Sequence, residues 1–183
     1  NGDDVTRLAT TKVTDMERLF QADASNSGTP SDFNQPIGNW DVSNVTDMAW
    51  MFFFCTSFNQ PIGYWDVSNV TDMADMFWGN YDFNQPIGDW DVSNVIRMQG
   101  MFDNAESFNS PIGNWNLSNA TTIESMFRDA FSFNQPIGDW NVSNVTKMAL
   151  MFNGASAFNQ PIGNWDVSNV SSNSDMYGVF SGA

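Results

Sequence analysis

Residues 33–57 read FNQPIGNWDVSNVTDMAWMFFFCTS, and this text returns with small changes every 25 residues along the chain. The repeated tryptophans show the register: Trp40, Trp65, Trp90, Trp115, Trp140 and Trp165. A fixed period between about 20 and 50 residues is typical of proteins built as a stack of similar supersecondary units. Each unit in such a stack contacts only its neighbours. The sequence therefore predicts a repeat protein.

The two halves of one repeat predict different local structures. Pro36 and Gly38 interrupt the first half, which we expect to hold a short extended strand that pairs only in part. In the second half, residues 45–52, the apolar side chains are spaced as on one face of a short helix, with Ser43 or Asn44 as its N-cap. The predicted fold is an α/β repeat solenoid, a stack of 25-residue coils with a strand and a short helix in each. A β-helix is the alternative.

The two ends of the chain depart from the repeat. Residues 1–32 are interpreted as a divergent N-terminal half-repeat, followed by a stretch rich in Ser, Gly, Asn and Pro that predicts an inserted surface loop. Residues 33–170 hold the six-fold 25-residue repeat. Residues 171–183 form either a divergent C-terminal half-repeat or a truncated edge, since terminal repeats are usually atypical.

The repeated positions have expected structural roles. The expected core of the first full unit consists of Phe33, Ile37, Trp40, Val45, Met48 and Phe52. Asn34 and Asn44, with their copies in later units, should stack into ladders whose side-chain amides bond to the backbone of the turns. Gly38 and its copies should supply either a special backbone angle or a close approach between coils.

Composition argues against several partners. The net charge is −15 with only six Lys and Arg residues. Nucleic-acid affinity comes mainly from basic groups that neutralise phosphates, so we expect no nucleic-acid partner. An anionic membrane surface is disfavoured for the same reason. No apolar run approaches the roughly 18 residues that span a bilayer, so we expect no membrane insertion.

Catalytic chemistry has few candidate residues. The chain contains no His and one Cys, which excludes Ser–His and Cys–His triads and the usual His/Cys zinc sites. No glycine-rich phosphate loop is present. Carboxylate pairs exist, but nothing singles one pair out from the repeats. We expect a protein that is not an enzyme and needs no cofactor.

Calcium is the one metal with a candidate site. The candidate column of carboxylates comprises Asp41, Asp66, Asp91 and Asp166. Stacked carboxylates repel, and calcium, which favours oxygen ligands, would relieve the repulsion. The same column also holds Asn116 and Asn141, and a position that accepts both Asn and Asp favours turn capping over metal binding.

The positions that vary between units indicate a contact surface. The columns that begin at Asp47, Trp50 and Phe53 change in every unit and should lie on the outer side of the predicted helix. The N-terminal half of this surface is aromatic, and its candidate binding residues are Trp50, Phe53, Phe54, Trp78 and Tyr81. Exposed aromatic clusters usually mark interaction sites. Neutral drift on a solvated surface is the alternative.

The segment 40–52, WDVSNVTDMAWMF, resembles the repeat of BspA-like leucine-rich-repeat surface proteins and of mycoplasmal surface lipoproteins. The resemblance covers nearly all of residues 13–180 and implies a right-handed leucine-rich-repeat-like stack at the cell surface or secreted. It implies adhesion or recognition of a protein or glycan and brings no catalytic residues. Departures are the Phe, Ile and Trp residues at positions where such repeats carry leucine.

Two other functions are kept as alternatives. The chain could be a structural scaffold subunit of a larger assembly, acting as an acidic spacer. It could also bind ice or a mineral surface, because Thr46, Thr71, Thr121 and Thr146 form a partial column that Ile96 interrupts.

Overall fold

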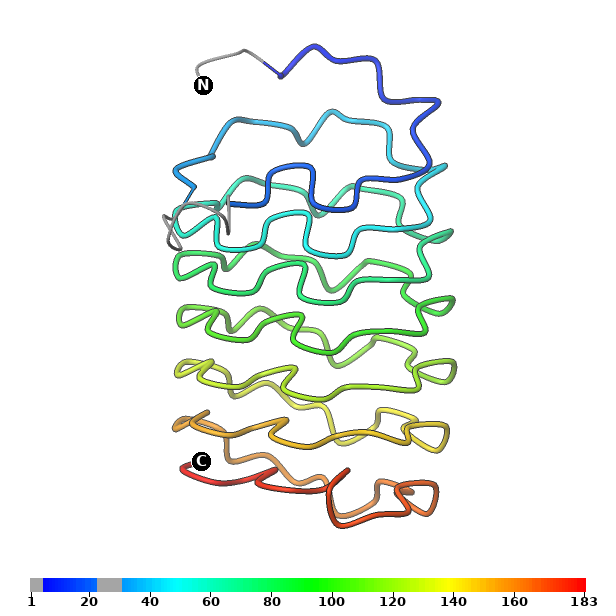
Figure 1. Ribbon diagram of the computed structural model, residues 1–183, viewed down its shortest axis with the longest axis vertical. Coiled ribbons are helices and arrows are strands. Elements are labelled where there is room, and N and C mark those ends of the chain that lie inside the picture. Colours follow the sequence, from blue (N-terminus) through cyan, green and yellow to red (C-terminus); the bar gives the residue numbers. More distant parts are fainter. Residues whose placement is uncertain (1–4, 23–30) are drawn as a thin grey trace.

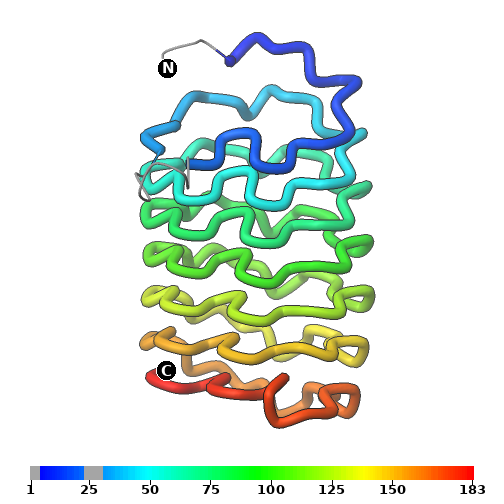
Figure 2. The backbone as a smooth tube through the Cα atoms, in the orientation of Figure 1, coloured from blue at the N-terminus to red at the C-terminus, as the bar shows by residue number. Residues whose placement is uncertain are grey.

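The computed structural model describes residues 5–22 and 31–183, which form a stack of coils (Figure 1). Coils that follow one another in sequence lie side by side along the long axis, with the N-terminal and C-terminal coils at opposite ends (Figure 2). The prediction of a repeat protein is confirmed. Most of the loop predicted to precede residue 33, residues 23–30, lies outside the described residues.

The predicted helix over residues 45–52 is wrong, and so is the α/β solenoid built on it: the described residues contain no helix. The Met51 N–H donates to the Met48 carbonyl at 3.2 Å, and Trp50, the third residue of this turn, has a φ of 55°. A three-residue hydrogen bond with positive φ at that position defines a type II turn. Phe54 repeats the pattern with a φ of 58°. Consecutive turns, not a helix, therefore space the apolar side chains.

The predicted strand and the β-helix alternative are also not found. In place of strands, the described residues hold single parallel bridges between neighbouring coils. The bridged pairs form one column: Asp15 with Asp47, Asp47 with Asp72, Asp72 with Arg97, Arg97 with Thr122, and Thr122 with Lys147. The proline in each first half removes a backbone donor, and turns close residues 37–40 and 42–45. The chain between turns is too short to pair as a strand.

Most hydrogen bonds between neighbouring coils run in one direction. The N–H groups of Met48, Phe52 and Phe54 donate to carbonyls 24 residues later in the sequence, at 2.9, 3.0 and 2.7 Å. The following coils repeat these bonds. Each coil therefore directs this row of N–H groups towards the C-terminal end of the stack and the matching carbonyls towards the N-terminal end.

Stacked aromatic rings fill the interior. The Phe52 ring lies 4.0 Å from the Phe58 ring within one turn of the stack and 5.6 Å from the Phe77 ring of the next coil. Such offset rings contribute beyond the apolar area that they bury. Of the expected core, all side chains except Phe33 are fully buried, and Phe33 packs against this core. Burial between coils makes each unit depend on its neighbours.

The amide ladders and the close approach at glycine are both present. Asn34 Oδ1 accepts the N–H of Asn59 at 3.1 Å, and Asn69 Nδ2 donates to the Ser43 carbonyl at 2.8 Å. A Cβ atom on Gly38 would lie 2.4 Å from the carbonyl oxygen of Pro61 in the next coil. Gly38 therefore allows two backbones to meet where any other residue would clash.

Candidate binding surface

The variable face consists of the three columns that begin at Asp47, Trp50 and Phe53 and recur every 25 residues. Along each coil these side chains alternate with buried ones such as Met48 and Met51, which are 0% exposed. The left-handed turn at Trp50 and the bridge at Asp47 direct the variable side chains away from the core. The variable face is therefore separate from the residues that hold the stack together.

Side chains of the variable face pair with the coil above or below. Arg128 Nη2 lies 2.8 Å from Asp103 Oδ2, and Arg97 forms an ion pair with Asp72. The partners in each pair are 25 residues apart, because stacking places equal positions side by side. Sequence reasoning missed these pairs, although opposite charges one period apart were their signal.

Four of the five candidate binding residues form one aromatic patch, which consists of Phe53, Phe54, Trp78 and Tyr81. The Phe53 and Trp78 rings are stacked, with centroids 4.6 Å apart. Phe54 meets Trp78 at 5.7 Å and the edge of Tyr81 at 6.3 Å. Tyr81 is 37% exposed and the other three are half-buried. The patch is a continuous, partly exposed aromatic surface across two coils.

A glycine gives the patch its shape. The Phe54 ring lies against Gly79, the equivalent residue of the next coil, where a Cβ atom would be 2.8 Å from Phe54 Cδ2. Later coils hold Asn104 and Asp129 in this column, so no second aromatic ring follows there. The patch is therefore confined to the N-terminal half of the variable face.

Trp50, the fifth candidate, has a different environment. The Arg18 guanidinium lies 4.0 Å from the centroid of its ring, and Trp50 Nε1 donates to Asp75 Oδ2 at 2.8 Å. A cation over an aromatic face is a favourable contact. Within the described residues no ring contact joins Trp50 to the aromatic patch. Its ring is held between the first coil and the third.

Two carboxyl groups near the patch have raised pKa values. Burial raises the pKa of Asp103 to about 6, although the Arg128 guanidinium acts in the opposite direction. Burial also raises the pKa of Asp75, against the hydrogen bond from Trp50. Desolvation disfavours the charged form of a carboxyl group. The surface next to the patch therefore titrates at a higher pH than an ordinary aspartate.

The carboxylate column considered for calcium caps turns. Asp41 Oδ1 accepts both the backbone N–H of Ser43, at 3.1 Å, and its hydroxyl, at 2.6 Å, and these bonds lower the pKa of Asp41. Asn116 Oδ1 accepts the N–H of Ser118 in the same way, at 3.1 Å. Asp66, Asp91 and Asp166 form the same turn. Among the described residues, no group of three or more His, Cys, Asp or Glu side chains is placed to hold a metal ion.

The partial threonine column is also used within the stack. Thr71 Oγ1 donates to the Thr46 carbonyl at 3.1 Å, and Thr146 Oγ1 donates to the Thr121 carbonyl at 3.1 Å. The hydroxyl hydrogens therefore point along the stack rather than outward. This arrangement gives no support to an ice-binding array.

Residues 1–111 and 81–183 each match the family described as "Mycoplasma protein of unknown function, DUF285", and together the two matches span the chain. The chain belongs to this family. Comparisons with curated proteins and with solved structures found no match. The family match supports the resemblance to mycoplasmal repeat proteins, and it does not extend to the BspA-like leucine-rich repeat. The described part of the chain contains no helix that could span a bilayer.

Proposed function

We propose that this protein is a non-enzymatic recognition module, displayed at the cell surface or secreted, that binds a protein or glycan partner through the aromatic patch. The observation behind the proposal is the patch itself: rings from two coils form one continuous, partly exposed surface. Contiguous exposed apolar surface of this kind marks interaction sites, and Trp and Tyr are enriched among residues that dominate binding energy.

The division of labour within each repeat supports a binding role. The stack is held by the buried Phe, Ile, Trp and Met columns and by the amide ladders. The variable face lies outside that framework, so its residues can change without loss of the fold. Rigid aromatic side chains on such a scaffold lose little conformational entropy when they bind. The patch is therefore suited to serve as an anchor for a partner.

The test uses the purified chain on a glycan array and, separately, in crosslinking to intact source cells. We expect a glycan signal or a crosslinked surface protein, weakened about tenfold or more by Trp78→Ala and by Tyr81→Ala. The control is Tyr64→Ala, because Tyr64 is 97% exposed and lies outside the patch. Binding that is equal in all variants, or absent from both experiments, contradicts the proposal.

A further inference from the structure

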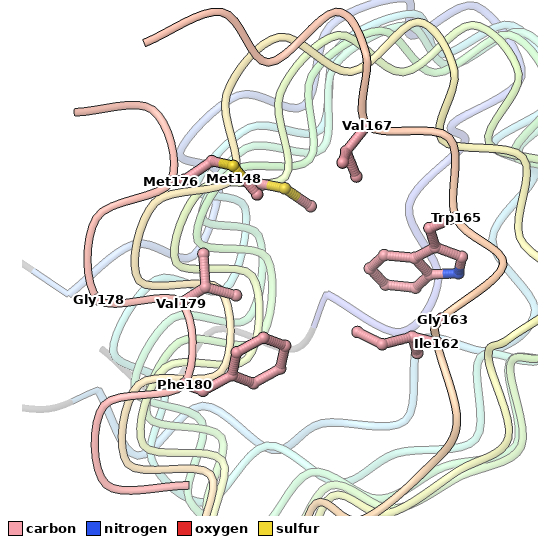
Figure 3. A pocket seen from close by; sticks show the side chains of 9 residues that line it. All are labelled: Met148, Ile162, Gly163, Trp165, Val167, Met176, Gly178, Val179 and Phe180. Atoms are coloured by element: carbon pink, nitrogen blue, oxygen red, sulfur yellow. The ribbon is translucent and has the colours of Figure 1, made fainter. Parts of the chain in front are cut away.

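The C-terminal end of the stack exposes side chains that are buried in every inner coil. Phe180 is 54% exposed, whereas Phe152, the residue beneath it, is 0% exposed. Met176 is 43% exposed, against 2% for Met148. These side chains border an apolar hollow of about 450 Å³, in which Val179 and Phe180 face Trp165 and Ile162 (Figure 3). We call this surface the C-terminal face.

The C-terminal face also has a row of unused backbone donors. The N–H groups of the last coil (residues 158–183) at the donor positions of the inner coils belong to Met176, Gly178, Phe180 and Gly182. Within the described residues these N–H groups have no acceptor. Exposed rows of unpaired backbone groups are templates for pairing with another chain.

One glycine at this face shows how closely another backbone could approach. At Gly38 and its next four copies, a Cβ atom would lie 2.2–2.5 Å from a proline carbonyl of the following coil. Gly163 is the next copy in this column, and its Cβ would meet nothing within 4 Å. The C-terminal face therefore has the shape of a surface on which a further coil rests.

The opposite end of the molecule offers complementary groups. The carbonyls of the first coil (residues 5–22) at the acceptor positions of later coils belong to Asp15, Glu17, Leu19 and Gln21. In the described part of the chain none of these four accepts a hydrogen bond. Leu8 and Leu19 are 55% and 48% exposed at this end, in columns that are otherwise core. We call this surface the N-terminal face.

The charges of the two ends are also complementary. The first coil holds Arg7, Lys12 and Arg18, which are three of the six basic residues of the chain. The last coil holds Asp166 and Asp175 and no Lys or Arg. Opposite charge favours contact between unlike ends, and like charge opposes contact between two C-terminal faces.

We propose that the C-terminal face of one copy binds the N-terminal face of a second copy, so that the chain associates head to tail. Continuation of the register pairs the N–H of Met176 with the Asp15 carbonyl of the second copy and the N–H of Phe180 with its Leu19 carbonyl. Such a contact joins two different surfaces and leaves one of each free, so further copies add in the same way. The proposal does not depend on the aromatic patch.

The experiment is sedimentation of the 183-residue chain over a wide range of concentration. We expect a series of oligomers that grows with concentration. Phe180→Asp blocks one face and Leu19→Asp the other, so each variant alone should be monomeric. An equal mixture of the two should form dimers and nothing larger, because one usable face of each kind remains. Tyr177→Asp, at a residue 70% exposed, is the control with equal charge change and should associate like the unaltered chain.

Several results would overturn the proposal. The unaltered chain is then monomeric throughout, or Leu19→Asp associates as well as the unaltered chain while Phe180→Asp does not, which indicates a symmetric contact between C-terminal faces. A mixture that stays monomeric has the same meaning. Circular dichroism melts establish that each variant is folded. Met176→Asp and Leu8→Asp provide a second pair, and both of these side chains are exposed in the single copy.

Discussion

Gly113 faces the carbonyl oxygen of Pro136 in the next coil, and an added Cβ atom would lie 2.4 Å from it. Both partners are backbone atoms near the core, so neither side can move away without loss of stacking. Gly113→Ala should lower the free energy of unfolding by about 2–3 kcal/mol. Gly163→Ala is the matched control, because Gly163 has nothing within 4 Å. Urea unfolding of dilute protein measures both, and equal effects would contradict the close approach.

Asp103 is 3% exposed, and burial raises its pKa to about 6. The folded chain therefore binds more protons at this group than the unfolded chain between about pH 4 and 6, so stability falls as pH rises through that window. We expect a loss of about 1 kcal/mol from pH 5 to pH 7 that Asp103→Asn removes. The lowered pKa values of Asp41, Asp91 and Asp166 act in the opposite direction, below this window.

Urea unfolding at the two pH values tests this prediction. Asp139→Asn is the control, since it removes one carboxyl group from an exposed position and changes the net charge equally. If Asp103→Asn and Asp139→Asn keep the same pH dependence, general charge repulsion rather than the buried carboxyl group explains it. The Arg128 guanidinium and the Asn104 amide, which both contact Asp103, remain in place in these variants.

At the scale of one coil, the turns depend on two left-handed residues. Ser125 has a φ of 54° and occupies the position of Gly100 in the preceding coil. A residue other than glycine costs roughly 1–2 kcal/mol in this conformation. Ser125→Gly should therefore raise the free energy of unfolding by about 1 kcal/mol, after the greater flexibility of glycine in the unfolded chain is subtracted.

The neighbouring residue provides the control for this prediction. Glu124→Gly replaces a residue without positive φ, so only the cost of glycine flexibility remains, about 0.5–1 kcal/mol of destabilisation. Thermal melts of both variants should shift in opposite directions. Two shifts of the same sign would mean that the left-handed conformation at Ser125 stores no strain.

The turns explain which part of the coil the sequence predicts. The 25-residue period, the core columns and the amide ladders follow from repetition, because equal positions must stack. The helix prediction failed because type II turns give nearly the same apolar spacing as a short helix. Gly100, Gly79 and Asn104 at the left-handed positions were a signal for turns. Trp50 and Phe54 at the same positions hid it, since large side chains seldom adopt positive φ.

The candidate surface was predictable to a similar depth. The period alone brings Phe53 and Trp78 together, because they are one repeat apart. It does not say that Arg18 covers Trp50, because the first coil is separated from the next by a longer interval of 32 residues. The open C-terminal face was not predictable either, since backbone donors carry no sequence signal.

At the scale of the whole molecule, the net charge of −15 on a 183-residue stack opposes folding through self-repulsion. Added salt shortens the range of this repulsion, to about 10 Å at 0.1 M ionic strength. We therefore expect the melting temperature to rise when sodium chloride is added from very low ionic strength, and to level off once the charges of neighbouring coils are screened. Calcium chloride at equal ionic strength should give the same rise, because the aspartates of the candidate column already bind their own turns. A larger rise with calcium, reversed by a chelator, would show that these carboxylates bind the ion in preference to capping the turns.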